Sequence, residues 1–287
     1  MSKASFRFGT VGSPKSTPKK PGGSVGAVLH SAELGLYTLE LGWVRSVRVS
    51  EKTCTLIKET ASAQDVAISV HAPYYINLNA DNDEWPKSRK RLMDAAFYGN
   101  LSGATDIIFH PGSYFGRPPE EVLPLAIERL RGCVDELRAD GNPVILRPET
   151  MGKSAMLGSL EDTLKMSQAM DGVLPCLDFA HLHARPGDGS MNTYDEWVSC
   201  LENYRHALGK DSLKELHIHL SGIEYGEKGE REHLPLEEAD LDLEALFRGL
   251  YDYDCQGRIL CESPILEEDA LYMQSVWGKI SGAETSV

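Results

Sequence analysis

The chain has 287 residues, enough for two small domains or for one barrel of about 250 residues. Hydrophobic residues make up 41% of it, and no run approaches the roughly 18 uncharged apolar residues that a membrane span needs. The formal net charge of −14 repels nucleic acid overall, unless bound cations reverse the potential of a cleft locally.

The lack of an apolar span and the start of the sequence favour a cytoplasmic protein, which we expect by default. Met1–Phe8 lacks the apolar core of a secretory signal. The cysteines form no CxxC pair and no framework spacing, so we expect free buried thiols and neither disulfides nor a thiolate zinc site. They are Cys54, Cys133, Cys176, Cys200, Cys255 and Cys261.

Short apolar runs recur along the chain and are mostly continuous, which is typical of parallel strands covered on both faces. Segments with helical periodicity separate them, most clearly Leu123–Leu137 and Ala270–Ile280. In chain order, the predicted strands are Phe6–Val11, Tyr37–Leu41, Val66–His71, Asp106–His110, Val144–Arg147, Leu174–Phe179, Leu216–Leu220 and Arg258–Cys261.

Alternating strands and helices form either an open doubly wound sheet or a closed barrel. No glycine-rich nucleotide-binding motif follows the first strand, and eight units follow one another without a break in composition. We therefore predict a single α/β domain over residues 1–287, a (β/α)8 TIM barrel. The basic loop Ser13–Gly23 after the first strand is predicted to be solvated and flexible.

Imidazole and carboxylate side chains occur where six consecutive predicted strands end. The chemistry of a barrel lies at these C-terminal ends and in the loops that follow them. Burying so many ionisable groups without a cation would cost several kcal/mol for each unpaired charge. The residues are His71, His110, Glu149, Asp178, His181, His219 and Glu262, with His233 in the loop after strand seven.

This mixture of ligands predicts a metal centre that binds Zn²⁺, with Mn²⁺ or Fe²⁺ as alternatives. Other histidines receive structural interpretations. His30 and His206 are expected on helix surfaces, and His217 is expected to point to the face opposite His219. For His183 a supporting role and a loop position both remain open.

The motifs at these strand ends resemble those of endonuclease IV, a zinc-dependent apurinic/apyrimidinic endonuclease family among the xylose isomerase-like barrels. The resemblance covers residues 66–264 in the same order. The matching segments are VHAPYYINL, IIFHPGS, PETMGK, LDFAH, HLSG and ESP.

The resemblance implies three zinc ions. His71, His110 and Glu149 would bind the first. Glu149 would bridge to the second, which would also take Asp178, His219 and Glu262, and would orient the attacking hydroxide. His181 and His233 would hold the third. Tyr74 matches a tyrosine that enters DNA beside the abasic site, and Arg45 is a looser candidate for such a wedge.

The chain departs from the family pattern at three loops. Arg231 stands where the family has an aspartate ligand of the third zinc. Glu230 or Glu232 could supply that carboxylate if the loop carries an inserted residue. The loops after strands two and five, GWVRSVRV and MGKSAMLG, also differ from the usual pattern.

By this resemblance the protein would hydrolyse double-stranded DNA on the 5′ side of abasic sites in base-excision repair and leave a 3′-hydroxyl. We expect no obligate protein partner. A sugar isomerase or epimerase that uses one metal, held by Glu149, Asp178, His219 and Glu262, remains an alternative. So does a barrel that keeps its metals without catalysis. Basic residues near the mouth could seat the DNA backbone: Lys15, Lys19, Lys20, Arg45, Lys153 and Lys228.

Overall fold

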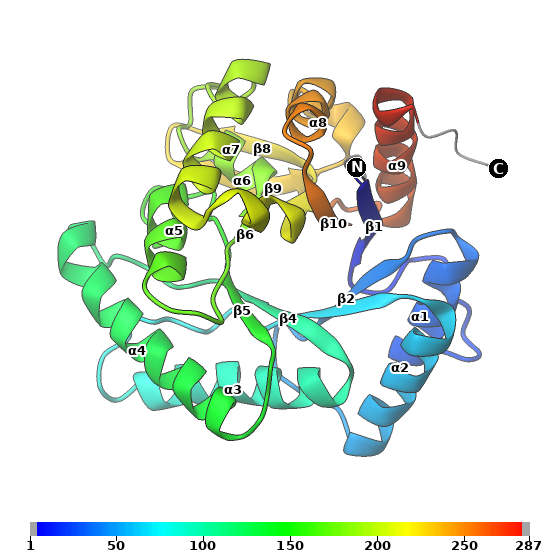
Figure 1. The fold of residues 1–287 in the computed structure, drawn as a ribbon, viewed down its shortest axis with the longest axis horizontal. Coiled ribbons are helices and arrows are strands. Elements are labelled where there is room, and N and C mark those ends of the chain that lie inside the picture. The colour runs from blue at the N-terminus through cyan, green and yellow to red at the C-terminus, as the bar shows by residue number, and fades with distance from the viewer. Residues whose placement is uncertain (1–4, 283–287) are drawn as a thin grey trace.

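A computed structural model describes residues 5–282. The prediction that no secretory segment lies in Met1–Phe8 therefore falls partly on residues outside the described range. The main sheet has eight parallel strands in the order β5-β4-β3-β2-β1-β10-β7-β6 (Figure 1). They are β1 (Ser5–Val11), β2 (Thr38–Gly42), β3 (Ala67–His71), β4 (Ala104–Phe109), β5 (Ile145–Pro148), β6 (Cys176–Asp178), β7 (Leu216–Leu220) and β10 (Gln256–Cys261).

The two ends of this sheet meet, so the strands enclose a barrel. Single parallel bridges join Leu146 to Val173 and Glu149 to Cys176, across the seam between β5 and β6. The Thr150 N–H also donates to the Cys176 carbonyl at 3.0 Å. The predicted (β/α)8 TIM barrel is confirmed, and all eight predicted strands are present with shifts of up to two residues at their ends.

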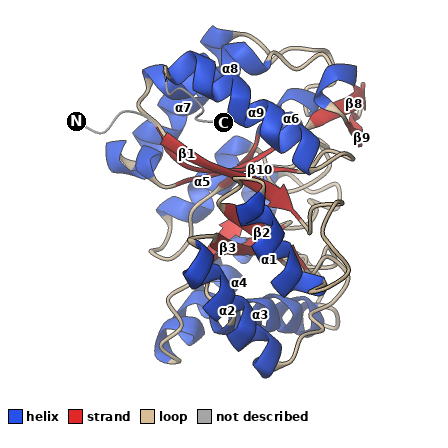
Figure 2. Cartoon of the chain, turned by 90° about the vertical axis from the view of Figure 1, so that its right-hand side faces the viewer, coloured by secondary structure: helices blue, strands red, loops and turns tan. Residues whose placement is uncertain are grey.

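Helices alternate with the strands and surround the barrel (Figures 1 and 2). Between residues 5 and 282, none of them is long and apolar enough to cross a membrane. They are α1 (Gly23–Glu33), α2 (Glu51–Gln64), α3 (Trp85–Leu101), α4 (Pro119–Ala139), α5 (Leu160–Gln168), α6 (Phe179–Ala184), α7 (Tyr194–Leu208), α8 (Leu243–Asp252) and α9 (Glu267–Ser281), with 3-10 turns at Lys210–Lys214 and Leu236–Glu238.

The helices begin and pack where the sequence favours it. Ser159 and Thr193 form capping boxes at the starts of α5 and α7. The apolar stripe of α4 is buried against the barrel, as its periodicity predicts. Ala270 and Met273 of α9 are likewise buried.

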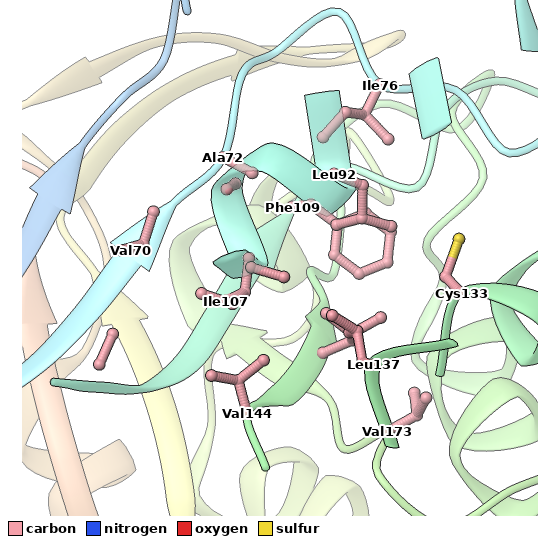
Figure 3. Packing of buried hydrophobic residues seen from close by; sticks show 14 of the residues in the cluster. Val70, Ala72, Ile76, Leu92, Ile107, Phe109, Cys133, Leu137, Val144 and Val173 are labelled. Atoms are coloured by element: carbon pink, nitrogen blue, oxygen red, sulfur yellow. The ribbon is translucent and has the colours of Figure 1, made fainter. Parts of the chain in front are cut away.

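Part of the core lies between the outer helices and strands β3 to β5. Val70, Ile107 and Phe109 of the strands pack with Leu92 of α3 and Leu137 of α4 (Figure 3). These side chains are almost completely buried. The packing fixes the strands, and with them the positions of the residues at the strand ends.

Three local features bear on the predictions. The hairpin of β8 (Gly222–Gly226) and β9 (Gly229–Leu234) was not predicted, because its polar sequence lacks an apolar run; Figure 2 shows it at the edge of the molecule. All six cysteines are free and buried, as expected. The basic loop Ser13–Gly23 exposes its lysines, but the N–H groups of Lys15 and Ser16 donate to the Glu267 carboxylate.

Candidate metal centre

A first group of potential ligands joins three strand ends at the barrel mouth. The Nε2 atoms of His71 and His110 each lie 3.3 Å from Oε2 of Glu149. Nδ1 of His71 lies 2.9 Å from the Ala72 carbonyl, which can only accept a hydrogen bond. Nδ1 therefore donates to that carbonyl, and Nε2, which faces Glu149, is the nitrogen that can bind a cation once it is deprotonated.

A second group shares Glu149 with the first. It consists of Glu149, Asp178, His219 and Glu262, whose ligand atoms lie within 4.8 Å of one another. Nδ1 of His219 is 3.5 Å from a carboxylate oxygen of both Glu149 and Glu262. Oε1 of Glu149, Oδ2 of Asp178 and Nδ1 of His219 are buried without a hydrogen-bond partner among the described residues. A divalent cation would satisfy these atoms, so the group fits one.

The start of α6 explains the positions of Asp178 and His181. Asp178 ends β6 and caps α6, and its Oδ1 accepts the backbone N–H of His181 at 2.7 Å. This cap makes the turn in which residues three apart both face the mouth. The DxxH spacing is thus a strand-to-helix junction that presents two ligands.

A third group lies beside these two and combines α6 with the β8–β9 hairpin. Nε2 of His181 is 3.3 Å from Nε2 of His233 and 3.7 Å from Oε2 of Glu230. Nδ1 of His181 donates to the Thr150 carbonyl at 2.9 Å, which makes Nε2 the nitrogen that can bind a cation once it is deprotonated. Glu230 is mostly buried, whereas Glu232 is exposed, so the carboxylate in this group is that of Glu230.

A β-bulge in β9 explains this choice of carboxylate. Glu224 pairs with Glu232, but its neighbour Tyr225 pairs with Glu230 and skips Arg231. Arg231 is therefore an extra residue, and its guanidinium lies outside on Glu224 at 2.8 Å. The bulge brings Glu230 to the same face as His233, although the two are three residues apart.

The loop after β5 holds this part of the hairpin in place. The Glu230 N–H donates to the Gly152 carbonyl at 2.9 Å, and Lys153 bridges to Gly229. A β-carbon at Gly152 would lie only 2.6 Å from Cβ of Glu230. Glycine at 152 is therefore required for the position of Glu230.

Inside the barrel below His219, the direction of the His217 side chain differs from the sequence prediction. His217 does not point to the opposite face: residues two apart in a strand share a face, and both histidines point into the barrel. Nε2 of His217 lies 2.9 Å, and Nε2 of His219 3.1 Å, from oxygens of Glu40. Cys176 completes a fourth group of potential ligands with these histidines.

Glu40 and Glu230 are the residues that sequence reasoning missed or left open. A charged residue inside the apolar run of β2 was the available signal for Glu40. His30 and His206 lie on α1 and α7, His30 partly buried and His206 exposed. His183 is buried and its Nε2 contacts Asp240 at 2.9 Å, close to the hairpin.

The three groups open into a cavity of 620 Å³ at the barrel mouth. Tyr74 lines it, is 49% exposed, and stacks on the His110 ring with centroids 4.9 Å apart. Its N–H donates to Val44, the residue before Arg45. Arg45 is exposed and does not line the cavity, and the lysines predicted near the mouth are exposed as well.

Protons and carboxylates compensate one another in the metal-free centre. Burial alone would lower the pKa of His71, but its hydrogen bond and charge interaction with Glu149 raise it to about 9. Burial also opposes protonation of His181, yet Asp178 and Glu149 raise the pKa of His181 to about 10. Burial would raise the pKa of Glu149, but the surrounding histidines hold it well below its usual range. The centre thus favours positive charge at its middle, which a divalent cation supplies.

The sequence is similar to proteins with and without an assigned activity. It is 38% identical over 274 residues to an uncharacterized protein of Methanocaldococcus jannaschii, covering 95% of this chain and 97% of that protein. It is 33% identical over 174 residues to a probable endonuclease 4 of Geobacillus sp. WCH70. That match covers 57% of this chain and 55% of the relative, so it spans about half of the endonuclease.

Solved structures of an endonuclease and of an epimerase-like protein are among those that share the fold. The crystal structure of endonuclease IV from Thermus thermophilus superposes with a TM-score of 0.71 at 22% identity, covering 96% of this chain and 98% of the other. A D-tagatose 3-epimerase-like protein superposes with a TM-score of 0.72 at 18% identity, covering 98% and 100%. The family model for xylose isomerase-like TIM barrels matches residues 28–276, and the chain therefore belongs to that family.

Proposed function

We propose that the chain is a metal-dependent phosphodiesterase that cuts the DNA backbone on the 5′ side of abasic sites and leaves a 3′-hydroxyl, as in base-excision repair. One observation carries the proposal: three groups of ligands adjoin one another at the barrel mouth. A sugar isomerase that uses a single metal needs only the four-residue group. The histidines of the other two groups then have no common role.

Each group would hold one divalent cation, with Zn²⁺ favoured by the mixture of imidazole and carboxylate. Such cations activate water at neutral pH and neutralise the phosphoryl oxygens of a phosphodiester. Glu149 belongs to two groups, so its carboxylate would set the spacing of two cations. His71, His110 and His219 contact that carboxylate from positions at or just after the ends of three different strands.

Other residues would bind the DNA. Tyr74 presents a half-exposed ring at the cavity and could stack beside the abasic gap, where a base is missing. Arg45 and Lys153 are exposed on loops after β2 and β5 and could contact phosphates. Three Zn²⁺ would raise the formal net charge from −14 to −8, with the change concentrated at the mouth.

The test uses a DNA duplex that contains one tetrahydrofuran abasic analogue. Zinc-loaded protein is expected to cut it on the 5′ side of the analogue and to leave an intact duplex uncut. Protein treated with a chelator, and the Glu149→Gln variant, are expected to be inactive. The absence of any metal-dependent cut by the loaded protein would exclude the proposed activity.

An isomerase or epimerase that uses one metal is the second candidate. Glu149, Asp178, His219 and Glu262 supply its ligand set, and two carboxylates there could move protons beside a ketose. The number of bound metals separates the candidates. A content near three per chain favours the nuclease, whereas a content near one, with epimerisation of a ketose, favours the isomerase.

A further inference from the structure

A carboxylate is buried inside the barrel directly below the candidate metal centre. Glu40 belongs to β2 and is completely inaccessible to solvent. Its Oε2 accepts a hydrogen bond from Ser69 Oγ at 2.8 Å and lies 2.9 Å from Nε2 of His217. Its Oε1 lies 3.1 Å from Nε2 of His219. Groups from β3 and β7 thus surround a single carboxylate of β2.

The strand register holds this arrangement. Ser69 is the direct partner of Glu40 in the ladder between β2 and β3. His217 and His219 lie one above the other on the inner face of β7. Oε1 of Glu40 and Nε2 of His219 lie 3.1 Å apart, and neither forms a hydrogen bond with any described residue, so each is available to the other.

An apolar side chain would fill this position with a smaller loss of folding free energy, because burying a carboxylate costs several kcal/mol of stability unless donors surround it. What the carboxylate adds is control over which nitrogen of His219 carries the proton. If Nε2–H points to Glu40, the lone pair is on Nδ1. Nδ1 is the atom that faces Glu149 and Glu262.

We propose that Glu40 is a positioning residue that fixes the ring orientation and tautomer of His219, so that its Nδ1 is ready to bind a cation. Ser69 and His217 hold the other oxygen and so prevent the carboxylate from turning away. Carboxylates behind metal-binding histidines have this effect in other proteins, and their loss weakens metal affinity about 10- to 100-fold. The inference rests on the proposed metal binding.

The first test measures metal affinity by competition with a chelator. Glu40→Gln keeps the shape but replaces the charged carboxylate, which has two acceptor oxygens, with a neutral amide that has only one. Both the parent and the test protein carry Glu230→Ala, which is expected to remove the third site and leave the two sites that share Glu149 to be measured. Glu40→Gln is expected to weaken Zn²⁺ binding about 10- to 100-fold relative to that parent.

Glu267→Gln is the matched control, because Glu267 is also buried and accepts hydrogen bonds, but from Lys15 and Ser16. It is expected to leave the affinity unchanged. Unchanged affinity in Glu40→Gln, or equal losses in both variants, would overturn the role of Glu40. If the parent itself binds no metal, the proposed function fails first and this inference fails with it.

The second test needs no change at Glu40 and therefore remains valid if Glu40→Gln does not fold. Nitrogen-15 NMR of the ¹¹³Cd²⁺-loaded protein reports which imidazole nitrogen binds the metal. For His219 the metal coupling is expected at Nδ1 and the proton at Nε2. Coordination of the metal through Nε2 of His219 would overturn the proposal.

Discussion

Tyr225 pairs with Glu230 in the β8–β9 hairpin, although an unbroken register from the Ile223–His233 pair would place Arg231 opposite it. The residue opposite Tyr225 shares a face with His233. The bulge therefore gives Glu230 the place that a regular strand would give Arg231, two residues before the histidine. A carboxylate reaches the third group of ligands in a sequence where arginine occupies the expected position.

This register predicts different results for adjacent residues. Glu230→Ala should remove one bound metal per chain, whereas Glu232→Ala should retain all of them, because Glu232 is exposed. Metal content after gel filtration measures both. Arg231→Asp in the Glu230→Ala background should not restore the lost metal, since residue 231 faces away. Restoration would show that the bulge is not present in solution.

The close approach of Gly152 to Glu230 gives a second prediction. Gly152→Ala should displace Glu230 and lower the metal content by about one, because its β-carbon would lie 2.6 Å from that of Glu230. Gly132→Ala in α4 is the control, since no atom lies within 4 Å of its new methyl group. That control should raise the free energy of unfolding by up to about 1 kcal/mol. Full metal content in Gly152→Ala would contradict the packing.

The histidines predict how pH affects metal binding. The pKa of His71 is raised from 6.5 to about 9, so its proton stabilises the metal-free protein below pH 6.5 and this stabilisation is lost as the pH rises towards 9. Metals must displace that proton. The increase in Tm caused by Zn²⁺ should therefore grow between pH 6.5 and about 9.

Thermal unfolding of loaded and metal-free protein across this range measures the effect. The metal-free Glu149→Gln variant should lose most of the pH dependence contributed by His71, because Glu149 is the main partner that raises its pKa. If the increase in Tm caused by Zn²⁺ became smaller as the pH rises, the proposed displacement of the His71 proton by the metal would be refuted.

Tyr74 gives a prediction about the substrate and not about the metals. Stacking of an aromatic ring on a base contributes about 1–3 kcal/mol, so Tyr74→Ala should lower kcat/KM on the abasic duplex about 5- to 150-fold. The metal content should not change, because Tyr74 contacts the His110 ring and supplies no ligand. Tyr75→Ala is the control on the same loop and should have a smaller effect. Equal losses in both would argue against a specific role for Tyr74.

The sequence by itself determined the barrel and most of the candidate centre. Buried parallel strands require continuous apolar runs, and their carboxyl ends meet at one edge, so His71, His110 and Glu149 could be placed together from their positions after such runs. The order of the strands and the free cysteines followed from the same local patterns.

Only the tertiary structure decided which carboxylate accompanies His233 and what lies below His219. The hairpin that carries the bulge at Arg231 is bridged to the loop after β5, far away in the sequence. Glu40 and His217 are 177 residues apart, and no local pattern links them. Periodicity reports which face of a strand is buried, but contacts between distant segments depend on how the whole barrel closes, and that closure brings these groups together.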